Sequence, residues 1–279
     1  MTTSTRTRRF CRTTSLIRRA DHTIHPGTNL PVLLLVSVAT LCVILPASAE
    51  QSSVHTALAP FSAEYDIKVA GVTVGKLIRR YEIDSRDRYV FSSTSESSGI
   101  AALFQENSTN ESSRGQITDS VFTSKQYSRT RRKGKKTKTE TVDFDFDEGI
   151  AIKSRRGATQ KVMLTTPSFD PLSYQLQLMH DLYLKKSELA YNIHSAKKLK
   201  LYGAETDLIE SVETPYSTLS AVKVIQQTSD GKKTTFWCAE TLGFLPVKVT
   251  IEEDDRTTTI VLKAYVRLTA ADLSHESEG

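Results

Sequence analysis

The stretch VDFDFD at residues 142–147 bears on the fold class more directly than any other part of the sequence. Val142, Phe144 and Phe146 are apolar, and an aspartate follows each of them. A period of two places the three apolar side chains on one face of a β-strand and the aspartates on the other. The stretch therefore predicts a half-buried strand whose aromatic face points toward a core.

Similar two-residue periods extend in both directions from this stretch. They predict further strands at residues 61–69, 72–83, 89–95, 106–115, 121–133, 150–152, 162–164, 189–193, 198–202, 208–212, 219–227, 234–239, 245–251 and 257–268. Residues 106–115 are unusually polar for a strand, so we expect them at a sheet edge or along a wet cavity.

One segment has helical spacing instead. Asp170 can cap a helix that runs from Pro171 to Leu184, with apolar side chains such as Leu172 and Leu176 on one side. About a dozen strands and one helix predict a mainly β fold. We expect a single twisted antiparallel sheet, curled into a half-open barrel, with the helix packed in or across its concave side.

Residues 1–49 are typical of a cleavable secretory signal with a long N-region. Six arginines come first, an apolar run follows at Val32–Leu45, and Ala47-Ser48-Ala49 forms a small-x-small site. As a helix the apolar run would measure about 21 Å, against a hydrocarbon core of about 30 Å. We therefore expect cleavage, with no transmembrane span afterwards.

The predicted cleavage leaves three regions: a flexible leader at 50–60, a β-rich domain at 61–269 and a polar tail at 270–279. Together they carry 31 basic and 31 acidic residues, so we expect no general attraction to nucleic acid. Cys238 is the only cysteine after residue 49, which excludes an intramolecular disulfide. We expect a periplasmic protein of a Gram-negative envelope.

Several landmarks occur in a fixed order after residue 60. They are Phe61-x-x-x-Tyr65, the spaced Gly71 and Gly75, Asp170-Pro171-Leu172-Ser173, Trp237, and Leu245-Pro246. In this order the sequence resembles a bacterial exported family, the domain of unknown function 3108. The resemblance covers nearly all of the chain after the signal. It implies an exported β-rich protein, and it brings no known reaction and no catalytic residues.

Seven cations surround Gly134: Arg129, Arg131, Arg132, Lys133, Lys135, Lys136 and Lys138. They could bind a lipid headgroup, a phosphate or an acidic partner. Alternatively, they form a solvated hairpin tip whose charges keep strand edges from pairing wrongly. The candidate ligand-binding residues are four cations for a headgroup and three aromatic residues as apolar lining: Arg131, Arg132, Lys135, Lys136, Phe144, Phe146 and Trp237. Trp237 is most simply a core anchor.

The sequence contains no recognisable catalytic or metal-binding motif. Its histidines after the signal lack metal-ligand spacing, and Cys238 has no basic neighbour to activate it. We therefore expect no cofactor, no metal and no catalytic residue. The best-supported function is a non-enzymatic binding or assembly factor for a lipid or other amphipathic envelope molecule, with a lipid or an envelope protein as partner.

Two alternatives stay open. A periplasmic hydrolase or envelope-modifying enzyme would need distant polar residues to converge, such as His180 with Asp181 or His194 with Glu210. A structural docking protein would instead present a large exposed apolar patch.

Overall fold

The computed structural model describes residues 58–99, 107–227, 232–254, 256–269 and 272. The predicted signal, most of the predicted leader and most of the polar tail lie outside this part of the chain. Leu58 is buried, and the carbonyl of Pro60 accepts a hydrogen bond from the N–H of Leu268. The fold therefore begins slightly before the first strand.

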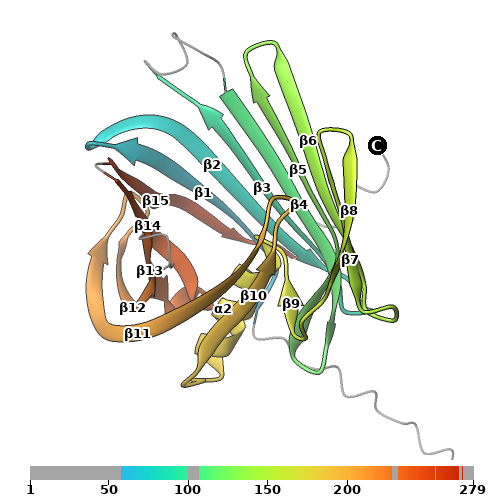
Figure 1. Cartoon of the computed structure of the whole chain (residues 1–279). Helices are drawn as coiled ribbons and strands as arrows, with labels where there is room; N and C mark the ends of the chain where they lie inside the picture. The colour runs from blue at the N-terminus through green and yellow to red at the C-terminus, as the bar shows by residue number, and fades with distance from the viewer. Residues whose placement is uncertain (1–57, 100–106, 228–231, 255, 270–271, 273–279) are drawn as a thin grey trace, which may run out of the picture. The chain divides into compact units, whose positions relative to one another are not determined.

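Fifteen strands and one α-helix make up the described fold (Figure 1). The first eight strands are β1 (Phe61–Val69), β2 (Val72–Ile83), β3 (Arg88–Ser97), β4 (Asn107–Thr118), β5 (Val121–Lys133), β6 (Lys136–Asp145), β7 (Ile150–Arg155) and β8 (Ala158–Met163). They are followed by β9 (Ser168–Phe169), α2 (Ser173–Tyr183), β10 (Leu189–His194), β11 (Leu199–Glu213), β12 (Thr218–Gln227), β13 (Lys233–Ala239), the 3-10 turn η1 (Glu240–Leu242), β14 (Leu245–Glu253) and β15 (Arg256–Arg267).

All the strands belong to one sheet, in the order β8-β7-β6-β5-β4-β3-β2-β1-β15-β14-β13-β12-β11-β10-β9. Neighbours are antiparallel, except for the short parallel pairing of β9 with β10. The first and last strands of the chain meet in the middle, because β1 pairs with both β2 and β15. In the described residues β8 and β9 end the sheet without pairing to each other, so the prediction of an unclosed, barrel-like sheet is confirmed.

The structure overturns one prediction about individual strands and excludes one of the two alternatives for another. Residues 198–202 and 208–212 belong to one long strand, β11, in which the register shifts between Thr206 and Ile209. A local interruption of the two-residue period was therefore a bulge and not a turn. The polar strand β4 is not an edge, because it pairs with β3 and β5 along its length.

The helix α2 joins the two halves of the sheet, since it packs against β5 on one side and β10 on the other (Figure 1). It begins at Ser173, two residues later than predicted, after a turn at Pro171 and Leu172. Asp170 is therefore not the N-cap, a position that Leu172 occupies, but its Oδ1 accepts hydrogen bonds from the N–H groups of Leu172 and Ser173 at the start of the helix.

Side chains fill the space between α2 and the sheet. Leu176, Met179 and Phe122 are at most 1 % exposed, and Phe122 also contacts the rings of Tyr81 and Tyr89. Burial of large aromatic side chains provides most of the free energy that holds such a core together. Around these residues, the interface between α2 and the sheet is therefore core.

Within the described residues, no helix combines the length and the apolar character needed to cross a membrane.

Candidate functional site

A basic groove opens on the concave face of the sheet, where β5, β6 and β7 approach the start of α2 and the turn between β10 and β11. Its volume is about 350 Å³. Seven of its lining residues are lysines or arginines and one is acidic: Tyr127, Arg129, Arg131, Lys138, Glu140, Arg155, Arg156, Pro171, Ser195, Ala196, Lys197 and Lys198. A concave surface lined by one sign of charge focuses the electric field and attracts counter-ions.

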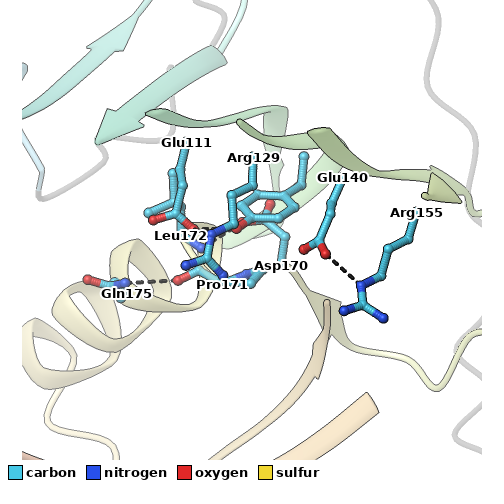
Figure 2. A network of polar contacts seen from close by, with 9 residues as sticks. Glu111, Arg129, Glu140, Arg155, Asp170, Pro171, Leu172 and Gln175 are labelled. Carbon is cyan, nitrogen blue, oxygen red and sulfur yellow. Dashed lines mark hydrogen bonds and ion pairs between the residues drawn. The ribbon is translucent and has the colours of Figure 1, made fainter. Parts of the chain in front are cut away.

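A row of alternating charge forms one side of the basic groove. Glu111 of β4 lies opposite Arg129 of β5. Glu140 of β6 lies opposite both Arg129 and Arg155 of β7. Register partners project from the same face of a sheet, so these four residues form a charge row beside the start of α2 (Figure 2).

Ion pairs hold the two arginines of the charge row. The Nε of Arg155 donates to Oε1 of Glu140 at 2.6 Å. The Nε of Arg129 lies 3.6 Å from Oε1 of Glu111, an ion-pair distance that is too long for a hydrogen bond. Tyr127 also donates its hydroxyl to Glu111. The acids therefore position the guanidinium groups and neutralise part of their charge.

Other cations of the basic groove are not neutralised in this way. Arg131, Lys138, Arg156 and Lys197 have no carboxylate within 4 Å in the part of the chain that the structure describes. Four such charges around one concavity repel each other, and an anion would relieve that repulsion. The arrangement is suited to binding an anionic group.

A buried polar cluster lies below the groove and has a structural role. Oδ2 of Asp170 accepts hydrogen bonds from the hydroxyls of Ser113 (2.6 Å) and Ser124, while Oδ1 accepts from the N–H groups at the start of α2. Burial raises the pKa of Asp170, and these hydrogen bonds oppose that increase. Because its acceptor sites are occupied by protein donors, Asp170 ties α2 to β4 and β5 and offers little to a ligand.

The structure divides the four predicted headgroup contacts. Arg131 lines the basic groove. Lys136 projects from the same face, because its pair with Lys133 lies four register pairs beyond Arg129 and Glu140, an even number. Arg132 alternates with Arg131 and projects from the opposite face, and Lys135 lies in the turn. Only half of the predicted set therefore shares the concave face.

The three predicted aromatic residues do not share a lining. Phe144 is buried, and its ring stacks on the ring of Phe146, which is 36 % exposed and follows the end of β6. Trp237 lies on the face of β13 opposite to Phe236 and Cys238. Its indole donates to Glu210 at 2.7 Å, and no contact joins it to either phenylalanine within the described residues.

The two predicted catalytic pairs are not assembled. The ring nitrogens of His180 are buried and have no hydrogen-bond partner among the described residues. Asp181 is bonded to Gln177 and Tyr191 instead. His194 contacts the hydroxyl of Ser168, whereas Glu210 is held by Trp237 and Lys223. Burial lowers the pKa of His180 and raises the pKa of the Cys238 thiol, as expected for core residues.

Several groove residues were missed by sequence reasoning. Arg155 ends β7, and Arg156, Lys197 and Lys198 lie in two short turns, where single cations are common and carry no signal. One signal was available in the acids: Glu111 and Glu140 each interrupt a polar strand on the same face as the basic run. Pairing the strands correctly would have placed them beside Arg129.

A second hollow of about 440 Å³ lies beside Tyr89 and Arg114. Both signs of charge line it, and Asp84 forms an ion pair with Arg88 at 2.6 Å. This hollow has no excess of cations comparable to that of the basic groove. In the described residues there is also no cluster of three or more histidines, cysteines or acids placed to hold a metal ion.

The fold and the groove together define an open, barrel-like protein built from one antiparallel sheet. The chain belongs to the family described as "Protein of unknown function (DUF3108)", whose model matches residues 64–263. The predicted resemblance is therefore confirmed.

Comparison with solved structures shows the same architecture. The chain is similar to the crystal structure of a beta-barrel-like protein of domain of unknown function DUF1849 from Brucella abortus, with a TM-score of 0.53 and 12% identity. The likeness covers 76% of this chain and 99% of that chain, and at this identity it shows the fold alone. No curated protein matches the sequence.

Proposed function

We propose that this protein is a non-enzymatic binding or assembly factor of the bacterial envelope, exported to the periplasm, whose basic groove holds the anionic group of a lipid or another amphipathic molecule. The observation that carries the proposal is the concentration of seven cations around one 350 Å³ concavity. The signal pattern in residues 1–49 supports export.

The size of the groove limits what it holds. A volume of about 350 Å³ is at the small end of ligand sites. The interface between α2 and the sheet is filled by side chains such as Leu176 and Phe122. The groove therefore suits a headgroup, while an apolar part of the ligand would stay in the membrane or contact another surface.

Vesicle flotation tests this proposal. The purified protein should float with vesicles that contain phosphatidylglycerol and should not float with neutral phosphatidylcholine vesicles. Each cation near an anionic membrane contributes about 1 kcal/mol, so replacing Arg131 and Lys138 with glutamine should weaken binding about thirtyfold.

The matched control is the double variant Arg132→Gln with Lys135→Gln. It removes the same charge from the same hairpin but not from the groove, so it should weaken binding only a few-fold. Equal losses in both double variants, or no binding to anionic vesicles, would contradict the proposal.

A structural docking role has one observation in its favour. Apolar side chains are exposed along β11, and the register shift places both Leu208 (75 % exposed) and Ile209 (67 %) in solvent. If this surface docks another envelope protein, replacing both residues with serine should abolish co-purification of that partner from the host and leave vesicle flotation unchanged.

A further inference from the structure

The cations of the concave face form ordered rows that begin in the groove and continue beyond it. On β5 and β6, Arg131 lies opposite Lys138, and the next pair on the same face is Lys133 with Lys136. We call the first pair the middle row and the second the tip row. Successive rows are two residues apart along each strand, or about 7 Å. Figure 1 shows both strands running well past α2, and the four side chains of these rows are exposed.

Like charges directly opposite each other weaken a strand pair, so both rows carry a cost that the fold does not require. Protection of a sheet edge accounts for Lys136 and Lys138, because this end of β6 extends beyond its pairing with β7. It does not account for Arg131 and Lys133, because β5 pairs with both β4 and β6 at these positions. The other face of the same hairpin avoids this arrangement: Thr130 lies opposite Thr139, and their hydroxyls are 3.2 Å apart. The cations are therefore concentrated on the face that leads into the groove.

The rows differ in how firmly their cations are held. Arg129 and Arg155, at the groove, are oriented by Glu111 and Glu140. The side chains of the middle and tip rows have no ion-pair partner among the described residues. Arginine matches the geometry of a phosphate with two parallel hydrogen bonds, while lysine acts as a point charge. This face therefore offers a phosphate site with positioned arginines, followed by the middle and tip rows, whose side chains can adjust to a ligand.

The geometry points to a ligand with at least two phosphate groups, one bound in the basic groove, which includes the middle row, and the next at the tip row. This inference rests on the proposed function and specifies the chemistry of its ligand. A bisphosphorylated lipid headgroup and a soluble oligophosphate share that chemistry, and the experiment below separates the two sources.

Calorimetric titrations with inorganic phosphate and with tripolyphosphate test the number of phosphate groups. The purified protein should bind tripolyphosphate more tightly than phosphate. The tip-row variant, Lys133→Gln with Lys136→Gln, should bind phosphate as the unaltered protein does but lose about tenfold in affinity for tripolyphosphate. The control variant, Arg132→Gln with Lys135→Gln, should retain both affinities within about twofold. Equal losses in the tip-row and control variants would overturn the inference.

Flotation separates the sources of the phosphate. Cardiolipin has two phosphates per molecule. If a lipid supplies the phosphates, the protein should bind cardiolipin vesicles more tightly than phosphatidylglycerol vesicles of equal phosphate content. Of the two double variants, only the tip-row variant should lose this preference. If the protein binds anionic vesicles, but the tip-row variant binds both vesicles and tripolyphosphate as the unaltered protein does, the inference is overturned while the proposed function stands. Binding of tripolyphosphate that depends on the tip row, without any vesicle binding, would support the inference and contradict the lipid proposal.

Discussion

Along β5 and β6, a single face of the sheet has two parts with opposite chemistry. Near the base, Tyr127 and Val142 are buried beside α2. Four register pairs further on, Arg131 lies opposite Lys138, with no acidic partner among the described residues. The strands and their hydrogen-bonded ladder are continuous across both parts. The two parts differ because α2 covers only the part near Tyr127 and Val142. Burial therefore decides which part is core and which part can bind an anion.

The largest effect should come from the covered part, at Asp170. Replacing Asp170 with alanine would leave buried donors of Ser113, Ser124 and the first turn of α2 without partners, and should lower the free energy of unfolding by about 3 kcal/mol or more. Urea unfolding measures this change. Asp143→Ala, on a partly exposed site of β6, should cost no more than about 0.5 kcal/mol. Similar costs at both sites would show that the polar cluster does not hold α2 in place.

A second test uses the pH dependence of stability. Burial, with a smaller contribution from Lys153, lowers the pKa of His194 to about 4. Between pH 6.5 and about pH 4 the unfolded chain binds a proton that the folded chain does not, so stability falls as the pH falls through this range. We expect a loss of about 1–2 kcal/mol between pH 7 and pH 5.

Urea unfolding of the variant His194→Asn checks the assignment. Its stability should depend less steeply on pH, although part of the slope should remain because burial also lowers the pKa of His180. An unchanged slope in the variant would mean that the titration of His194 does not cause the pH dependence of stability.

The smallest effect on stability should come from the uncovered part, and its sign should be opposite. Removing the like-charged tip row with Lys133→Gln and Lys136→Gln should raise the free energy of unfolding by about 0.2–1 kcal/mol. The same variant should bind tripolyphosphate more weakly. A variant that loses both stability and binding would indicate that the two lysines support the hairpin itself.

The sequence was sufficient for the β-rich fold but only partly for the site. The alternation around Phe144 and the helical spacing after Asp170 are local patterns, and each appears in the structure where expected. The two-residue period also implied that the side chains of Arg131 and Arg132 project from opposite faces of the sheet. In contrast, the approach of Lys197 to Arg155 depends on how far the sheet curls, which no local pattern specifies.

The same limit explains the prediction for Trp237. An isolated tryptophan in a strand fits a core or a ligand site, and only the strand order shows that it sits beside Glu210 and Lys248, many strands away from Phe144. Sequence periodicity assigns residues to faces, while long-range strand pairing decides which faces meet.

The most direct test of the account is a nuclear magnetic resonance titration of the isotope-labelled protein with tripolyphosphate. Saturable changes in backbone amide shifts should concentrate at residues 129–138, 155–156 and 197–198, and the amides of α2 beyond its first turn should stay unchanged. Changes centred on α2 or on the β11–β13 face around Trp237, or no saturable change at all, would contradict the assignment of the uncovered concave face as the anion-binding surface.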